Sequence, residues 1–230
     1  LEAVDEALSS SMLLVMPTAA GKTAVIWMMI SEKLSRGGRV MMVAPTVGLV
    51  EQHIRSLREV LKLKDGIVQI TGQLPPAKRV EKWDGARLVV ATPKVVVNDV
   101  SNGVVDLSDF SVLVVDEAHH CTGDHAMAQV CDNYISKNVR PHILGVTASP
   151  GHRPEAVREI CKRTGAVRIH IRNSAEEMLS GYLSEPEVRE ITVSVPDEIV
   201  RLSEPFKIWQ QGIVDLSLIH ISEPTRLRSI

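Results

Sequence analysis

The sequence predicts an α/β fold in which a doubly wound, mostly parallel sheet is covered by helices on both faces. Short apolar runs alternate along the 230 residues with longer segments of helical periodicity, as repeated strand–helix–strand units require. The sequence is 44% hydrophobic but only 3% aromatic, because small aliphatic residues and methionine dominate it. That composition is typical of parallel strands that are buried on both faces.

The expected strands are short apolar runs that end at a polar or turn-forming residue. They are Met12–Met16, Val40–Ala44, Ile67–Ile70, Leu88–Ala91, Val112–Asp116, Ile143–Thr147 and Val167–Ile171. Several of the segments with helical spacing open with Thr or Pro, residues that favour a helix start. The expected helices are Leu1–Leu8, Lys22–Ser35, Val47–Leu61, Lys78–Trp83, Pro93–Val100, Ala126–Ser136 and Pro154–Arg163. Ligands bind outside the carboxyl ends of strands in such sheets, so functional residues are expected there.

The pattern predicts one domain over residues 1–172, truncated at its N-terminus, and a connector over residues 173–215. Leu216–Arg226 is identical to one reading frame of a transposase adapter used in DNA sequencing libraries. We therefore expect residues 216–230 to be translated adapter rather than native sequence, and fold reasoning stops before them.

Charge and composition exclude several classes of protein. With 26 basic and 28 acidic residues the net charge is −2, so any nucleic-acid contact must be local rather than a global basic surface. No apolar run approaches the roughly 20 residues that a membrane span requires. Three cysteines form no paired framework, which favours a reducing, cytoplasmic location. The run His119, His120, Cys121, His125 and Cys131 lacks the second close ligand pair of a zinc site, so no metal is expected there.

A phosphate-binding loop is expected directly after the first strand. It comprises Pro17, Thr18, Ala19, Ala20, Gly21, Lys22 and Thr23 and leads into a helix. Backbone N–H groups would wrap the β-phosphate, Lys22 would neutralise the β and γ oxygens, and the Thr23 hydroxyl would hold Mg²⁺. Met16 stands where the general pattern begins with Gly. Ala19 would be strained by about 1 kcal/mol or more if its φ were positive.

Two carboxylates follow the strand Val112–Asp116. Asp116 can bind Mg²⁺ through water, and Glu117 can accept a proton from the water that attacks the γ-phosphate. An isolated Asp-Glu pair after a strand is more often a helix cap, so the catalytic interpretation depends on the nearby Lys22 and Thr23. His119 is expected to bridge the ATP site to a neighbouring domain.

A third motif follows the strand Ile143–Thr147. Thr147, Ala148 and Ser149 offer two hydroxyls at a strand end, where a change between nucleotide states could be relayed. Alone they would pass for a capped turn. Combined with the phosphate loop and the Asp-Glu-Ala-His run, they form a specific signature that nucleotide kinases and small GTPases do not need.

Together these motifs resemble superfamily 2 helicases of the DEAH-box-like group, most closely the archaeal Hef and Fanconi anaemia M-type helicases. RIG-I-like and Dicer helicase domains are more distant. The resemblance covers about residues 1–200 and extends to Gln52-His53 and Asn98-Asp99. It implies a RecA-like P-loop NTPase domain that uses ATP and Mg²⁺, followed by a helical insert and a second RecA-like domain. Residues similar to those that hold the nucleic-acid backbone in this family are Pro45, Thr46, Gln52, Thr71, Gly72, Thr92 and Pro93.

The expected function is therefore an ATP-dependent motor domain that moves on or remodels branched or duplex DNA, as in DNA repair. Two alternatives stay open, namely an RNA-directed helicase of the RIG-I or Dicer type and a catalytically silent nucleotide-binding scaffold. The intact Lys22, Thr23, Asp116 and Glu117 argue against the scaffold, whereas Ala19 leaves it open. Without the arginine fingers of the second motor domain, the chain is expected to have weak ATPase activity.

Overall fold

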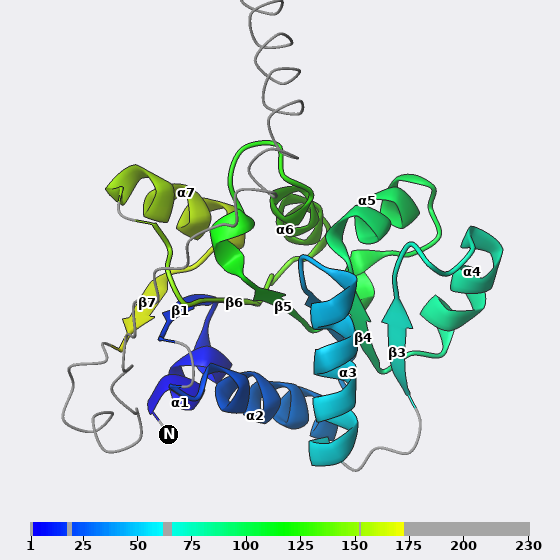
Figure 1. The fold of residues 1–230 in the computed structure, drawn as a ribbon, viewed down its shortest axis with the longest axis horizontal. Coiled ribbons are helices and arrows are strands. Elements are labelled where there is room, and N and C mark those ends of the chain that lie inside the picture. The colour runs from blue at the N-terminus through cyan, green and yellow to red at the C-terminus, as the bar shows by residue number, and fades with distance from the viewer. Residues whose placement is uncertain (1, 18–19, 62–65, 152, 173–230) are drawn as a thin grey trace, which may run out of the picture. The chain divides into compact units, whose positions relative to one another are not determined.

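Seven strands pair side by side in one sheet of the computed structural model, which describes residues 2–17, 20–61, 66–151 and 153–172 (Figure 1). They are β1 Met12–Val15, β2 Val40–Val43, β3 Ile67–Ile70, β4 Leu88–Ala91, β5 Val112–Asp116, β6 Ile143–Thr147 and β7 Arg168–Ile171. Their order is β3-β4-β2-β5-β6-β1-β7, and each of these neighbouring pairs is parallel. The predicted fold class is confirmed.

Helices cover both faces of the sheet. They are α1 Glu2–Ser9, α2 Lys22–Ser35, α3 Val47–Leu61, α4 Pro76–Asp84, α5 Pro93–Ser101, α6 Ala126–Lys137 and α7 Pro154–Thr164. In Figure 1, α1 to α3 lie on one side of the sheet and α5 to α7 on the other. Two short 3₁₀ turns, η1 Leu107–Asp109 and η2 Ala118–His120, complete the described elements. The sequence pattern did not predict these turns, because three residues are too few to show a helical period.

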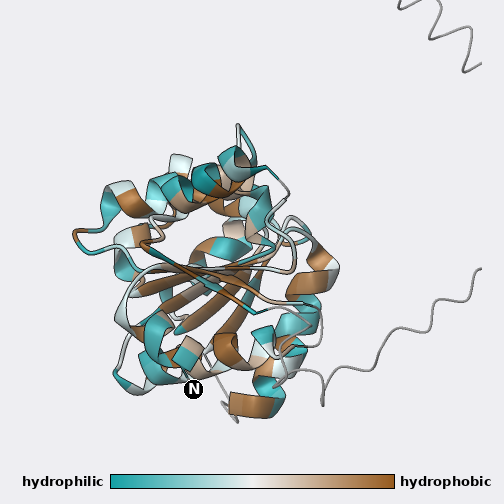
Figure 2. Ribbon diagram, turned by 90° about the vertical axis from the view of Figure 1, so that its left-hand side faces the viewer, coloured by the Kyte–Doolittle hydropathy of each residue, from teal (hydrophilic) through white to brown (hydrophobic). Residues whose placement is uncertain are grey.

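The core has two halves because successive strand residues point to opposite faces. Leu13 and Val15 of β1 belong to the half of the core that includes residues of α5, α6 and α7, whereas Met12 and Leu14 belong to the half that includes residues of α1, α2 and α3. Figure 2 shows the hydrophobic strands enclosed between helices of mixed hydropathy. Burial on both faces explains why the strands read as continuous apolar runs rather than alternating ones.

Local signals placed most helix boundaries within one or two residues. Helices α2 and α3 begin and end at the predicted residues, and α4 begins at Pro76 rather than Lys78. Proline is favoured in the first turn of a helix because that turn has no carbonyl partner for its N–H, so Pro75-Pro76 marks the true start.

The described residues all belong to one compact unit. The predicted connector, residues 173–215, and the predicted adapter, residues 216–230, lie outside the described part of the chain, so their boundaries remain predictions. None of the described helices is long and apolar enough to cross a membrane.

Candidate functional site

The predicted functional motifs all follow the carboxyl ends of strands and therefore lie along one edge of the sheet. The neighbours β1, β6 and β5 end at the phosphate loop, at Thr147 and at Asp116 respectively. The next three strands, β2, β4 and β3, end just before Pro45-Thr46, Thr92-Pro93 and Thr71-Gly72. Neighbouring strands are about 4.8 Å apart, so this order keeps the phosphate motifs together and the nucleic-acid motifs next to them.

The phosphate loop turns into α2 through Gly21. This residue caps the helix with φ +94°, a backbone conformation that residues other than glycine rarely adopt. The N–H groups of Ala24 and Val25 donate to the Gly21 carbonyl at 3.0 and 3.3 Å and start the helix. Thr18 and Ala19 lie outside the described residues, so the question of strain at Ala19 is not tested.

Lys22 lies at the start of α2, half-buried, with its amine turned back over the loop. Its Nζ donates to the carbonyl oxygen of Met16 at 2.9 Å. Burial lowers the pKa of Lys22, and attraction to the Glu117 and Asp116 carboxylates opposes that shift. Lys22 is therefore within electrostatic reach of both acidic residues, although it follows β1, a strand that is not adjacent to β5. The three residues proposed for catalysis converge on the same edge of the sheet.

Glu117 adopts a left-handed backbone conformation, with φ 54° and ψ 49°. For a residue with a side chain this costs roughly 1–2 kcal/mol, and such strain is characteristic of functional positions. The Glu117 N–H donates to Asp116 Oδ1 at 3.0 Å, which helps to hold the sharp turn from β5 into η2. The two neighbouring carboxylates contact different histidines, that of Asp116 contacting His53 and that of Glu117 contacting His119, as two separate roles would require.

His119 connects the acidic motif to the end of β6. Its Nδ1 lies 3.1 Å from Thr147 Oγ1 and 3.2 Å from Glu117 Oε2. Thr147 is fully buried, and its hydroxyl accepts the N–H of Ser149 at 3.2 Å. Ala148 and Ser149 are exposed just beyond. Three of the residues predicted for coupling or cofactor contact, His119, Thr147 and Ser149, are thus linked in one chain of contacts.

The oxygen atoms near Lys22 suit a magnesium ion. Thr23 is exposed on the first turn of α2, and Asp116 keeps further acceptor capacity after each of its oxygens has accepted one hydrogen bond. Magnesium prefers hydroxyl, carboxylate and water oxygens over nitrogen or sulfur and usually keeps several waters. By contrast, within the described residues no group of three or more His, Cys, Asp or Glu side chains could hold a metal ion.

The predicted nucleic-acid residues differ in exposure. Gln52 is exposed on the first turns of α3, and Gly72 is exposed after β3. Thr46 is also exposed, and its Oγ1 accepts the N–H of Leu49 at 3.3 Å, which caps α3. Thr71 and Pro93 are buried, so any contact they make with a ligand would use the backbone. Pro45 and Thr92 are intermediate in exposure, and Thr92 occupies the N-cap position of α5 without a capping hydrogen bond from its side chain.

Two buried polar contacts escaped prediction. His53 Nε2 lies 2.7 Å from Asp116 Oδ2, although 63 residues separate the two in sequence. Arg79 and Asp99 form a bidentate pair with both nitrogen–oxygen distances below 3 Å. The burial of His53 did have a signal in the sequence, because this residue falls at helical spacing in the apolar stripe of α3.

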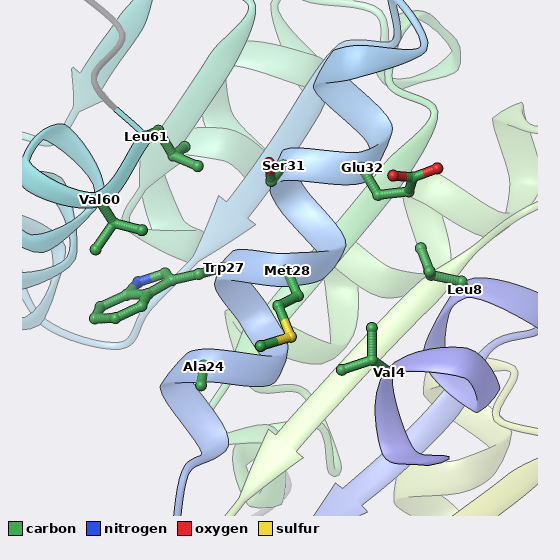
Figure 3. A pocket seen from close by; sticks show the side chains of 9 residues that line it. All are labelled: Val4, Leu8, Ala24, Trp27, Met28, Ser31, Glu32, Val60 and Leu61. Carbon is green, nitrogen blue, oxygen red and sulfur yellow. The ribbon is translucent and has the colours of Figure 1, made fainter. Parts of the chain in front are cut away.

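A pocket lined mostly by apolar residues lies on the outer face of α2 (Figure 3). Its volume is about 510 Å³, and α1, α2 and the end of α3 supply its walls. Trp27 lines it, and the indole Nε1 is buried without a hydrogen-bond partner among the described residues. None of the residues predicted for the ATP or nucleic-acid sites lines this pocket.

Comparison with known proteins assigns the chain to a family. A sequence profile of the DEAD/DEAH box helicases matches residues 1–157. The chain belongs to this family. A protein of Methanocaldococcus jannaschii named as an ATP-dependent RNA helicase is 38% identical over 94% of this chain. The Drosophila melanogaster DEAD-box ATP-dependent DNA helicase Fancm is 32% identical over 88% of it.

The solved structures agree with this assignment. The crystal structure of the Pyrococcus furiosus Hef helicase domain superposes with a TM-score of 0.76 at 32% identity, covering 84% of this chain and 42% of that one. The matched curated relatives are much longer proteins. This chain spans 29% of the Methanocaldococcus protein and 14% of Fancm. The predicted family and the RecA-like helicase fold are confirmed.

Proposed function

We propose that this chain is the ATP-binding first motor domain of a helicase or translocase that acts on branched or duplex DNA. The observation that carries the proposal is the order of six neighbouring strand ends. Strands β1, β6 and β5 bring the triphosphate motifs together, and β2, β4 and β3 carry the segments similar to those that hold nucleic acid. One edge of the sheet thus supports an ATP site beside a nucleic-acid site.

Each residue of the ATP site has a physical role in this proposal. The loop from Pro17 to Thr23 binds the phosphates, and Lys22 neutralises the charge of the β and γ oxygens. Thr23 and Asp116 hold Mg²⁺, Asp116 through bound water, and the ion adds charge neutralisation on the phosphates. Glu117 accepts the proton of the attacking water.

His119, Thr147 and Ser149 form the proposed relay between nucleotide state and the rest of the motor. The contacts of His119 with both Glu117 and Thr147 support this role, since a change at the γ-phosphate reaches β6 through a single side chain. The partner for this movement is a second RecA-like domain, which we place in the remainder of the protein. ATP would close the two domains on the nucleic acid, and hydrolysis would let them open again. We place this activity inside the cell.

DNA is the favoured nucleic acid because Fancm and the Sclerotinia sclerotiorum mph1 protein, which is 30% identical over 93% of this chain, are both named DNA helicases. RNA is the second candidate, because the Methanocaldococcus relative is named an RNA helicase. The nucleic-acid segments themselves do not discriminate, since their exposed groups are suited to backbone rather than base contacts.

The deciding experiment measures ATP hydrolysis by the full-length protein with forked DNA, with duplex RNA and with neither. We expect forked DNA to stimulate hydrolysis most. Lys22→Ala should lower the rate by at least about 100-fold, as expected for a group that stabilises the transferring phosphoryl charge. Lys137→Ala is the matched control, because Lys137 is an exposed lysine at the far end of α6.

Two outcomes would contradict the proposal. Equal rates with and without nucleic acid would exclude a nucleic-acid motor. Full activity of Lys22→Ala would exclude the assigned ATP site even if nucleic acid stimulates hydrolysis.

A further inference from the structure

Helix α3 joins the two proposed sites through one buried imidazole. The helix starts directly after Thr46 at the end of β2, and its buried stripe consists of Val50, His53, Ile54 and Leu57. His53 is the polar member of that stripe, and only 9% of its surface is exposed. An imidazole in this position needs a hydrogen-bond partner from another element, because its desolvation would otherwise cost free energy.

The partner is the carboxylate that the proposed function assigns to magnesium. His53 Nε2 lies 2.7 Å from Asp116 Oδ2, and the two side chains are 11% and 13% exposed. A carboxylate accepts, so the imidazole Nε2–H donates. The other oxygen, Oδ1, accepts the N–H of Glu117. One hydrogen bond from α3 and one from the strained turn therefore fix the orientation of Asp116.

The neighbouring residue on the same helix faces outward. Gln52 is exposed and belongs to the segments similar to those that hold the nucleic-acid backbone. Consecutive residues on a helix are about 100° apart, so one residue can reach a surface ligand while the next reaches the protein interior. Strands β2 and β5 are paired in register, which places the start of α3 beside the end of β5.

We propose that His53 is a positioning residue that couples nucleic-acid contact on α3 to the orientation of Asp116. This inference rests on the proposed function. A nucleic-acid backbone held by the first turns of α3 fixes that helix, and the His53 hydrogen bond passes its position to the carboxylate. Conversely, nucleotide and magnesium held at Asp116 fix α3 for nucleic acid. Binding coupling of this kind is reciprocal by thermodynamic necessity.

The test measures binding coupling rather than turnover. The dissociation constant for a fluorescent forked DNA is measured with the full-length protein, with and without AMP-PNP and Mg²⁺. The ratio of the two constants is the coupling factor. His53→Leu removes the donor while keeping an apolar side chain in the stripe, and we expect it to reduce the coupling factor about tenfold, within the range typical of coupled sites. His53→Gln keeps an N–H donor and should retain the coupling factor to within about threefold of the wild type.

His142→Leu is the matched control. His142 is partly buried and also hydrogen-bonded, with Nε2 donating to the Ala7 carbonyl at 2.7 Å, but it precedes β6 at the opposite edge of the sheet. Its loss should lower the unfolding temperature without changing the coupling factor. A purely structural histidine at position 53 would behave in the same way.

The outcomes separate this inference from the proposed function. If the wild type shows coupling and His53→Leu retains it fully while its unfolding temperature falls, His53 is structural and the inference is wrong. If His53→Leu does not fold, the test rests on His53→Gln, which keeps an N–H donor. Loss of coupling in the folded His53→Gln protein would contradict the assigned donor role. If the wild-type DNA affinity does not respond to AMP-PNP at all, the proposed function fails together with the inference.

Discussion

At the scale of single residues, Glu117 combines backbone strain with a proposed catalytic role. Its left-handed conformation is held by the hydrogen bond to Asp116 and by the η2 turn, neither of which requires the Glu117 carboxylate. Replacement of the carboxylate by an amide should therefore preserve the turn. The strain then serves to aim the side chain rather than to stabilise the fold.

We expect Glu117→Gln to bind ATP within about twofold of the wild type but to hydrolyse it at least about 100-fold more slowly, the usual range for loss of a general base. Nucleotide binding is measured with a fluorescent ATP analogue and hydrolysis by phosphate release in the full-length protein. Glu81→Gln, an exposed glutamate on α4, is the control. Hydrolysis unchanged in Glu117→Gln would remove the residue from the chemistry.

His142 gives a pH-dependent stability at the same scale. Its Nδ1 lies 3.1 Å from Lys33 Nζ, so the neutral ring accepts from the lysine while Nε2–H donates to Ala7. Burial lowers the pKa of His142, and the Lys33 charge lowers it further against the opposing effect of hydrogen bonds to backbone carbonyls. The unfolded chain therefore binds this proton at higher pH than the folded chain, and the folded state loses stability as pH falls through the unfolded pKa.

The expected result is that the free energy of unfolding falls between about pH 7.5 and about pH 5.5, and falls less in His142→Gln. One proton limits the slope contributed by this group to about 1.4 kcal/mol per pH unit. Urea unfolding at a series of pH values measures it for both proteins. Identical pH profiles would show that another group dominates this range.

At the scale of elements, a buried ion pair ties α4 to α5. Asp99 on α5 accepts from Arg79 Nε and Nη2 at 2.8 and 2.7 Å and from Trp83 Nε1 at 2.9 Å. Arg79 Nη1 also donates to the Leu74 carbonyl at 2.7 Å. The pair thus fixes both the loop after β3 and the helix after β4, which carry Thr71-Gly72 and Thr92-Pro93.

Breaking this pair from one side should be costly. Asp99→Asn leaves the Arg79 charge buried without its counterion, and we expect a loss of about 3–5 kcal/mol in the free energy of unfolding. The matched control is the exposed pair Glu32–Arg36, where Glu32→Gln should cost at most about 0.5 kcal/mol. Denaturant unfolding of both variants measures the difference. A similarly small loss of unfolding free energy in both variants would show that the buried pair does not stabilise the packing of α4 against α5.

The elements themselves could be predicted because their signals are local. Apolar run lengths gave the strands, and Thr46, Pro93 and Pro154 marked helix starts that the structure confirms to within one residue. The contacts between His53 and Asp116 and between Arg79 and Asp99 could not be predicted in the same way. Each depends on which strands are neighbours, and the order β3-β4-β2-β5 leaves no trace in the periodicity of any one segment.

The same limit applies to the candidate site. The motif spacing indicated Lys22, Asp116 and Glu117 as separate strand-end residues, whereas their meeting depends on β6 lying between β1 and β5. The left-handed conformation of Glu117 also left no signal, since Glu rarely adopts it. The sequence therefore indicated the candidate residues, whereas their arrangement relative to one another follows only from the order of the strands.

At the scale of the whole molecule, this chain carries one side of the proposed reaction centre. In the proposed function, its described residues supply the lysine and hydroxyl that follow β1 and the two carboxylates at the end of β5, and these groups would together bind a nucleotide with magnesium. Charge on the γ-phosphate oxygens in the transition state requires more cationic stabilisation than one lysine gives. In related phosphoryl transfer reactions an arginine finger contributes about 10³-fold or more to the rate.

We therefore expect residues 1–215 alone to bind an ATP analogue but to hydrolyse ATP about 10³-fold more slowly than the full-length protein under the same conditions. Forked DNA should not stimulate this residual rate, because closure of two motor domains on the strand is what links DNA to hydrolysis. Phosphate release from equal concentrations of both proteins, with and without DNA, measures the difference, and circular dichroism confirms that the fragment is folded. A folded fragment that hydrolyses ATP as fast as the full-length protein would place the complete reaction centre within this chain. The requirement for a second domain would then be wrong, although the assignment of Lys22, Asp116 and Glu117 would stand.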